Sequence, residues 1–318
     1  VTDTKGEVVF SNEQLAIIVN LNELTNKNIK ELDIPALNYL FKRVENKKRA
    51  DIEFEIELSD KSTKWVLGSM NQSKTTGEYI LVVHDITQLR QLNSMRRDFI
   101  SNLSHELRTP VSVIRANSET LLDGALESKK DAKVFAKAIL HNSERLSDMV
   151  TDLIDLSRIE YGDLKLNINK VDLKTFIDEF TLSIKSLTKK KDIEIINKSN
   201  HEEFVKADLQ ALERIMNNLV DNALKYSEKG SSIVISTIKE NQHIKIMVSD
   251  NGIGISEEDK NHIFDRFYRT ASARASDKQG SGLGLAIVKN LTNSLNGEVG
   301  VDSKYPNGSI FWFTLPIN

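Results

Sequence analysis

The sequence is organised around the stretch Phe99-Ile100-Ser101-Asn102-Leu103-Ser104-His105-Glu106-Leu107-Arg108-Thr109-Pro110. It places an imidazole beside a carboxylate, and a hydroxyl follows four residues after the imidazole. If the segment is helical, His105 and Thr109 lie on one face, because positions i and i+4 stack. Pro110 has no N–H group, so the carbonyl of Glu106 loses its helical partner, and we expect the helix to loosen next to His105. The stretch therefore combines a candidate nucleophile, a candidate base and a weak point. The alternative is that His105 simply faces solvent on the helix.

Helical spacing continues on both sides of this stretch. The first set of apolar residues advances by threes and fours, close to a coiled-coil seam: Leu89, Leu92, Met95, Phe99, Leu103, Leu107, Val111 and Ile114. A second pattern runs from Val134 to Leu156 and ends at Tyr161-Gly162. Two long helices joined by a short loop predict an antiparallel hairpin. Because one hairpin cannot bury such a seam, we expect a homodimer in which two hairpins form a four-helix bundle.

Composition limits the class of protein. A chain of 318 residues predicts two or three domains. The net charge of −3 argues against electrostatic binding of nucleic acid. The absence of cysteine excludes disulfides, thiolate catalysis and cysteinyl metal sites. No run approaches the ~20 apolar residues of a membrane span. Because Val1 reads as the middle of a domain, we expect the cytoplasmic portion of a longer, membrane-anchored protein whose anchor would lie upstream.

The first 86 residues alternate strand and helix signals. We expect strands at 7–10, 51–58, 65–67 and 79–83 and a helix at 34–46, which together make a small α+β domain. The opening Asp3-x-x-Gly6 and the closing Val82-Val83-His84-Asp85-Ile86-Thr87 resemble a PAS sensor domain. A dimerising spacer and a ligand-binding sensor remain equally open. His84 is interpreted as structural or solvated rather than as a ligand of a metal or haem.

Residues after 172 predict a third domain, preceded by a short polar linker at 163–172. Helices are expected at about 173–188, 207–226 and 284–295. Strands are expected at 233–239, 243–249, 298–303 and 309–315. This composition predicts an α/β sandwich with helices on one face of a mixed sheet.

Two amides and an amine stand out on the second of these helices. Asn218, Asn222 and Lys225 recur at spacings of four and three. They lie beside an expected buried stripe formed by Leu212, Met216, Leu219, Ala223 and Tyr226. An amide oxygen can ligate nucleotide-bound Mg²⁺ without adding negative charge near phosphates, and a lysine can neutralise a phosphate. The alternative is that both asparagines simply face solvent.

A second cluster, Asp250-Asn251-Gly252-Ile253-Gly254, follows a buried strand. A carboxylate at a strand end can accept a hydrogen bond from an exocyclic amine such as that of adenine. The glycines would let the backbone approach a flat ring without obstruction by Cβ atoms. The same five residues could equally form a β-turn.

Two further clusters follow along the chain. The segment 263–269 contains three aromatic residues and ends at Arg269, which could reach a terminal phosphate. Residues 270–279 lack any large apolar side chain and are interpreted as a mobile lid. Gly280, Gly282 and Gly284 then open a helix, whose N–H groups and dipole would favour an anion. The glycine spacing excludes a Rossmann fingerprint, and no Walker lysine follows.

In this order the four clusters resemble the N, G1, F and G2 boxes of sensor histidine kinases. The stretch from His105 to Pro110 resembles the phosphoacceptor box of the same family, and the resemblance covers essentially the whole chain. Residues 95–99 and 121–125 are similar to Gram-positive kinases that respond to phosphate or the cell wall. The implied domains are a PAS-like sensor (1–86), a signalling helix with a dimerisation and phosphotransfer hairpin (87–162), and a catalytic ATP-binding domain (163–318).

The resemblance implies that the γ-phosphoryl group of ATP passes to His105 and then to an aspartate of a response regulator. Glu106 would be the base, and Thr109 would orient the water that hydrolyses the regulator's phosphoaspartate. Mg²⁺ would be held by Asn222. The residues implied to bind the nucleotide are Asn218, Asn222, Lys225, Tyr226, Asp250, Gly252, Gly254, Arg269, Gly280, Gly282, Leu283 and Gly284.

Two other classes of protein remain open at this point. The third domain also resembles the wider superfamily of gyrase- and Hsp90-type proteins, in which ATP drives conformational work. Those proteins have no phosphoacceptor box, so acid-labile labelling of His105 would separate them from a kinase. A non-catalytic dimeric scaffold would bind no adenine nucleotide.

Overall fold

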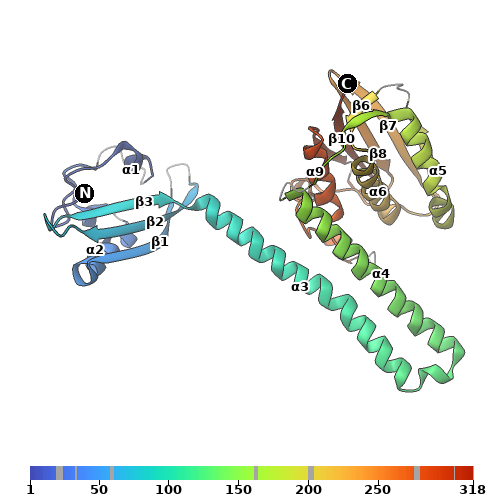
Figure 1. Ribbon diagram of the computed structural model, residues 1–318, viewed down its shortest axis with the longest axis horizontal. Helices are drawn as coiled ribbons and strands as arrows, with labels where there is room; N and C mark the ends of the chain where they lie inside the picture. The colour runs from blue at the N-terminus through green and yellow to red at the C-terminus, as the bar shows by residue number, and fades with distance from the viewer. Residues whose placement is uncertain are drawn as a thin grey trace. The chain divides into compact units, whose positions relative to one another are not determined.

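The computed structural model describes residues 1–18, 24–32, 34–57, 61–160, 164–199, 204–275, 280–303 and 305–317. These residues form two compact units, Val1–Ile100 and Ser101–Asn318. Mixed helix and sheet run through both, as the sequence predicts (Figure 1).

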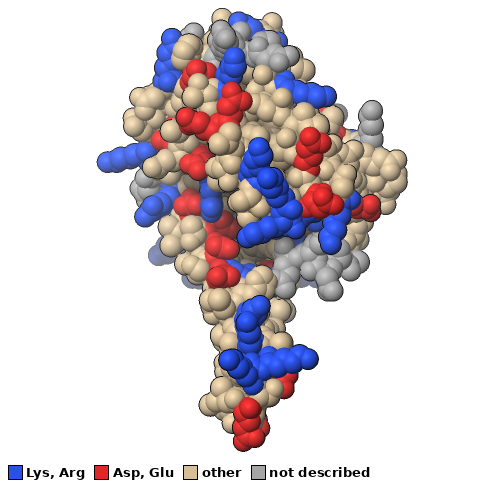
Figure 2. Space-filling view, turned by 90° about the vertical axis from the view of Figure 1, so that its right-hand side faces the viewer, with Lys and Arg blue, Asp and Glu red and all other residues tan. Residues whose placement is uncertain are grey.

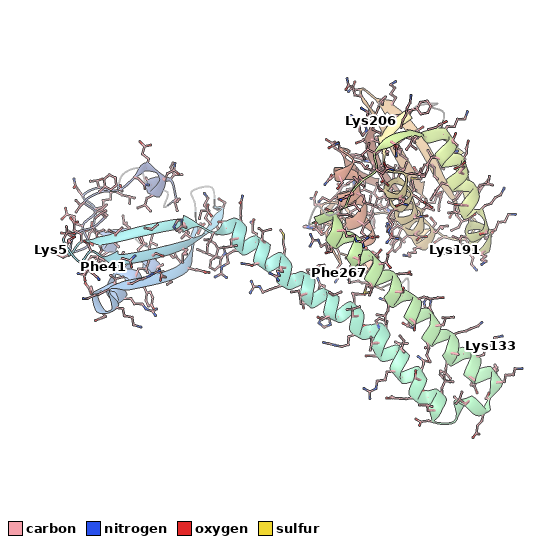
Figure 3. All side chains as sticks on the ribbon, in the orientation of Figure 1. Lys5, Phe41, Lys133, Lys191, Lys206 and Phe267 are labelled. Atoms are coloured by element: carbon pink, nitrogen blue, oxygen red, sulfur yellow. The ribbon has the colours of Figure 1, made fainter. Side chains whose placement is uncertain are left out.

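The first unit is built on a three-stranded antiparallel sheet of order β1-β2-β3. The strands are β1 (Arg49–Glu57), β2 (Thr63–Gln72) and β3 (Tyr79–Asp85). Helix α2 (Pro35–Lys47), which carries Phe41 (Figure 3), packs on β1 and β2. The ring of Phe41 meets that of Tyr79 edge-on. Helix α1 (Glu13–Ile18) and the 3₁₀ turn Ile29–Glu31 complete this part.

The strand predicted at residues 7–10 is wrong. The structure has isolated bridges there instead, joining Glu7 to Asn28 and Thr2 to Val8. The N–H groups of Val9 and Phe10 both bond to the carbonyl of Val1. Backbone partners are thus scattered over separate segments, and no continuous ladder forms. Residue 58, the last of another predicted strand, lies outside the described residues.

The second unit begins within helix α3 (Thr87–Leu122), which pairs with α4 (Lys129–Glu160). The 3₁₀ turn Ala125–Glu127 joins the two helices. α3 runs uninterrupted through Pro110, which is buried, so the expected loosening does not break the helix. Hydrogen bonds on either side of the proline maintain the helix, since the ring removes only one of them. The predicted end of the second helix, at 161–162, lies outside the described residues.

The C-terminal domain contains a five-stranded sheet of order β5-β7-β8-β10-β9. The sheet is mixed, as the sequence predicts. β5 (Glu194–Lys198) runs parallel to β7 (Ser232–Glu240), and all other neighbours are antiparallel. The remaining strands are β8 (His243–Asp250), β9 (Val299–Ser303) and β10 (Ser309–Pro316). Alternate residues of β7 and β8 are buried, which gives each strand one face toward the core.

Three long helices cover this sheet: α5 (Leu173–Lys191), α6 (Leu209–Tyr226) and α9 (Gly284–Ser294). α6 contacts β7 and β8, α9 contacts β9 and β10, and α6 and α9 contact each other. The helices therefore share one face of the sheet. Helix α4 of the hairpin also packs on α9, which brings the hairpin against the C-terminal domain.

The domain also contains a small second sheet that the sequence did not predict. β4 (Asn169–Asp172) pairs antiparallel with β6 (Phe204–Ala207), so the polar linker expected at 163–172 contains a strand. The helix expected from Ala207 begins at Leu209, because the side chain of Asp208 caps it by accepting from the N–H of Ala211 at 2.9 Å. These strands are short and pair across a long stretch of chain, so neither carries a clear periodic signal.

Within the part of the chain that the structure describes, no helix has the length and apolar character needed to cross a membrane.

Candidate active site

A cavity of about 590 Å³ opens beside α6, α9 and α4. Its volume is in the range of small-molecule and cofactor sites. Ten of the residues predicted to bind nucleotide line it: Asn218, Asn222, Lys225, Tyr226, Asp250, Gly254, Arg269, Gly280, Gly282 and Gly284. The two other predicted residues, Gly252 and Leu283, are buried and do not line the cavity. Four clusters spread over the sequence are thus brought to one place.

The amide cluster lies on the cavity side of α6. Asn218, Asn222 and Lys225 are half-buried, next to the fully buried stripe that the sequence predicts at Leu212, Met216, Leu219 and Ala223. Tyr226 is half-buried and lines the cavity, so its assignment to the buried stripe is wrong. It occupies the last turn of α6, where the helix meets the site.

Asn218 is held in a fixed orientation. Its Nδ2 donates to the carbonyl of Arg214 at 2.8 Å, so its Oδ1 faces the glycine-rich loop. A Cβ atom at Gly284 would lie 2.6 Å from that Oδ1. A Cβ atom where α9 begins would therefore force the amide of Asn218 to shift away from its position.

Asp250 ends β8 and turns its carboxylate into the cavity wall. Its Oδ1 accepts from the N–H of Gly252 at 2.8 Å. Burial raises the pKa of Asp250, and hydrogen bonds from the backbone N–H groups of Gly252 and Ser309 oppose that rise. A Cβ at Gly252 would lie 2.9 Å from the carbonyl oxygen of Tyr226, which explains the residue type there. The carboxylate is thus a partly desolvated acceptor, suited to an N–H donor of a ligand.

The glycine-rich loop packs on the aromatic segment. The N–H of Phe267 donates to the carbonyl of Gly282 at 2.9 Å, and both residues have positive φ, +59° and +70°. The segment 263–269 is therefore a turn-rich loop. Leu283, the residue before α9, makes no side-chain cap. The N–H groups of the first turn consequently remain available to an anion.

The predicted lid is only partly described. Ala271–Ala275 form the short helix α8, and residues 276–279 lie outside the described residues. Arg269 donates through Nη2 to the carbonyl of Ala273 at 2.6 Å, which ties it to the start of this segment. The mobility of the lid stays a prediction.

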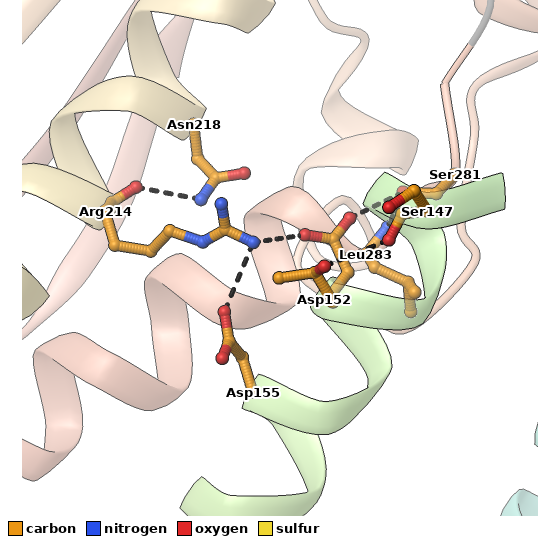
Figure 4. A network of polar contacts seen from close by, with 8 residues as sticks. Ser147, Asp152, Asp155, Arg214, Asn218, Ser281 and Leu283 are labelled. Atoms are coloured by element: carbon orange, nitrogen blue, oxygen red, sulfur yellow. Dashed lines mark hydrogen bonds and ion pairs between the residues drawn. The ribbon is translucent and has the colours of Figure 1, made fainter. Parts of the chain in front are cut away.

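Sequence reasoning missed the contribution of α4 to the cavity. Asp152 of α4 accepts from Arg214 Nη2 at 2.6 Å, and Asp155 meets the same nitrogen at 3.2 Å (Figure 4). The hydroxyl of Ser281 donates to the other oxygen of Asp152 at 3.3 Å. Burial raises the pKa of Asp152, while Arg214 and Ser281 lower it. These partners are far apart in sequence, so no local pattern could pair them.

The phosphoacceptor stretch does not itself line the cavity. His105 and Thr109 are exposed on α3, and the hydroxyl of Thr109 donates to the carbonyl of His105 at 3.4 Å. Glu106 is half-buried, and its Oε2 accepts from Nη2 of Arg145 on α4 at 3.0 Å. Arg145 does line the cavity. The ion pair between Glu106 and Arg145 therefore joins the phosphoacceptor stretch to the wall of the cavity.

Charged side chains of both signs share one face of the molecule. On the face shown in Figure 2, Lys and Arg side chains are interspersed with Asp and Glu.

Family models match two parts of the chain. Residues 95–162 match the His Kinase A (phospho-acceptor) domain. Residues 207–318 match the histidine kinase-, DNA gyrase B- and HSP90-like ATPase. The chain thus joins a histidine phosphoacceptor domain to an ATPase-type domain. It belongs to the sensor histidine kinases of two-component systems, and the ATPase-type domain is its ATP-binding part.

Similar proteins agree with this assignment. The chain is 31% identical over 327 residues to the sensor histidine kinase WalK of Bacillus subtilis, covering 99% of this chain and 52% of that protein. The histidine kinase AdeS of Acinetobacter baumannii has a TM-score of 0.56 at 27% identity, over 67% of this chain and 98% of that one. ShkA, solved in complex with AMPPNP, has a TM-score of 0.52 at 26% identity, over 68% and 45%. The chain spans about half the length of the curated relatives it matches.

Proposed function

We propose that this chain transfers the γ-phosphoryl group of ATP to His105 and then to an aspartate of a response regulator. The observation that carries the proposal is the cavity that gathers ten predicted nucleotide-binding residues, with one wall residue, Arg145, paired to Glu106 beside His105. The complex of ShkA with AMPPNP supports the choice of an adenosine triphosphate as the ligand.

In the proposed reaction, a ring nitrogen of His105 attacks the γ-phosphorus. The bond from that phosphorus to the β–γ bridging oxygen breaks, and ADP leaves. The proton released from the second ring nitrogen passes to Glu106. Neutral imidazole is already nucleophilic, so the protein must supply orientation and a proton acceptor more than activation. The phosphohistidine then donates its phosphoryl group to the carboxylate of a regulator, and His105 is restored.

The cavity residues have distinct roles in this proposal. Asp250 accepts from the exocyclic amine of adenine, and Lys225, Arg269 and the first-turn N–H groups of α9 spread the charge of a loose transition state. Asn222 fits Mg²⁺, because it offers a half-buried amide oxygen to a hard cation that takes its other oxygens from phosphates and water. When bound, Mg²⁺ would neutralise the phosphate oxygens. Among the described residues no acidic or histidine cluster offers it a separate cage.

We further propose that the protein dimerises through the hairpin. Several large apolar side chains of α3 and α4 are exposed in the single chain: Leu89, Leu92, Met95, Val111, Leu122, Val134 and Leu140. A second hairpin would cover such side chains.

Thr109, exposed one turn after His105, would orient the water that removes phosphate from the regulator. Residues 1–86 would form a PAS-type sensor.

Labelling with γ-³²P-ATP and Mg²⁺ tests the central proposal. We expect wild-type protein to acquire an acid-labile, base-stable label and His105→Gln to acquire none. A nucleotide-binding chain that takes no label would instead favour the gyrase- and Hsp90-type alternative. A chain that binds no adenine nucleotide would favour the scaffold. A label that persists in His105→Gln would refute the assignment of the phosphoacceptor.

A further inference from the structure

Arg145 occupies a place for which the phosphoacceptor and nucleotide motifs do not account. It lies on α4, contacts Glu106 of α3 at 3.0 Å, and lines the nucleotide cavity. The side chains of Arg145 and Glu106 are only 18% and 28% exposed. A pair this sheltered is screened less than a surface pair, so its geometry is held more firmly.

The environment of Arg145 is not arranged for maximal stability. Its Nε is buried and has no hydrogen-bond partner among the described residues. A buried donor left without an acceptor costs about 1–3 kcal/mol. Uncompensated groups of this kind call for a specific explanation, and a functional role is one of the recognised explanations.

Glu106 and His105 are adjacent on one helix, so their side chains point about 100° apart around the axis. Holding Glu106 against α4 therefore leaves His105 turned outward, as the structure has it. It also fixes the place of the Glu106 carboxylate, which belongs to the residue next to His105. Arg145 thus controls both the direction of the nucleophile and the position of its base.

We propose that Arg145 is a positioning residue for the phosphoryl transfer, and this rests on the proposed function. It anchors the carboxylate of Glu106 to the wall of the nucleotide cavity, so that ATP, His105 and the base are held in one arrangement. It acts through Glu106, and it is not required for binding ATP. An error of about 1 Å in such an arrangement can cost about 10²-fold in rate.

The test compares Arg145→Gln, Arg145→Lys and the control Lys133→Gln in the full chain. Lys133 lies on the same helix near the loop end of the hairpin and is exposed (Figure 3). Rates of His105 labelling are measured over a range of ATP concentrations, and melting temperatures report on folding. Arg145→Gln should lower the maximal rate roughly 10- to 100-fold, with the KM for ATP changed less than about threefold. Arg145→Lys should retain part of the rate, and Lys133→Gln should match wild type.

Two further measurements separate positioning from general damage. The reverse reaction, in which phosphorylated protein returns its phosphoryl group to ADP, should slow by the same factor as the forward reaction. In a double-mutant cycle, Arg145→Gln should add little to the loss caused by Glu106→Gln, because both act on one proton acceptor. Additive losses, or a rise in KM with the maximal rate intact, would overturn the inference. Wild-type protein that takes no label would refute both the inference and the proposed function.

Discussion

Asp250 should trade stability for nucleotide binding, so we expect Asp250→Asn to be more stable but unable to bind ATP well. In the structure its carboxylate accepts from the backbone N–H groups of Gly252 and Ser309, and Asp250 also lines the cavity. An asparagine would keep its oxygen toward Gly252 and turn an NH₂ group to the cavity. That NH₂ group and the exocyclic amine of adenine are both hydrogen-bond donors, so no hydrogen bond would form between them. Loss of a hydrogen bond to a charged group, about 1.5–3 kcal/mol, predicts ATP affinity about 10- to 150-fold weaker.

The gain in stability follows from the direction of the pKa shift. Because burial raises the pKa of Asp250, the folded chain holds this proton more tightly than the unfolded chain does. The resulting cost is absent below the ordinary carboxyl pKa and fully present once the pH exceeds the raised value. Removing the charge at neutral pH should stabilise the domain by about 0.5–2 kcal/mol, as other changes that trade activity for stability do. For a domain of this size each kcal/mol corresponds to about 2–4 °C in melting temperature.

The assays are calorimetric titration with ATP and thermal unfolding without nucleotide, each repeated from pH 4.5 to 8. Wild-type affinity should fall as the pH drops toward the raised pKa of Asp250, because the protonated carboxyl no longer accepts freely. Asp250→Asn should lack this dependence. ATP affinity of the variant within twofold of wild type, or a melting temperature several degrees lower, would show that the reasoning about this carboxylate is mistaken.

Three other substitutions test separate parts of the site. Gly284→Ala should weaken ATP binding about 10-fold or more, since its Cβ would lie 2.6 Å from Asn218 Oδ1 and shifts of this kind cost about 1–3 kcal/mol. Nucleotide titration measures this loss, and Ser294→Ala, at the far end of α9, is the control. Thr109→Ala should keep autophosphorylation but lose dephosphorylation of the regulator that the kinase labels fastest; equal loss of both activities would contradict the role of Thr109. Arg214→Ala should destabilise the second unit by about 1–3 kcal/mol, because it leaves the half-buried Asp152 without its cation. Calorimetry should find a smaller loss in Asp152→Asn, where partial burial already disfavours the charge.

The sequence predicts the parts of the fold whose signals are local. The apolar residues of the hairpin helices repeat every three to four residues, so both helices were expected. β7 and β8 alternate buried and exposed residues, and both were expected within one residue of their observed bounds. The small sheet of β4 and β6 was not, because its strands are short and only pairing across the chain defines them.

The candidate site divides in the same way. Clusters around Asn218, Asp250 and Gly282 were visible because each carries an unusual residue type at a fixed spacing. The contributions of Arg145 and Asp152 were invisible, since both residues resemble ordinary charges on a solvated helix. Only the packing of α4 on the C-terminal domain turns them toward the cavity. Their partners, Glu106 and Arg214, lie 39 and 62 residues away in the chain.

The uncapped start of α9 has a consequence for the lifetime of the protein. A helix whose first turn lacks a side-chain cap gives up about 0.5–2 kcal/mol that a cap would supply. A bound triphosphate would return this energy by accepting from the same N–H groups, and it would add its own binding term, which grows with the logarithm of its concentration. The C-terminal domain should therefore resist proteolysis best when nucleotide is abundant. An energy-depleted cell would clear this kinase faster, so the abundance of the protein would follow the supply of its own phosphoryl donor.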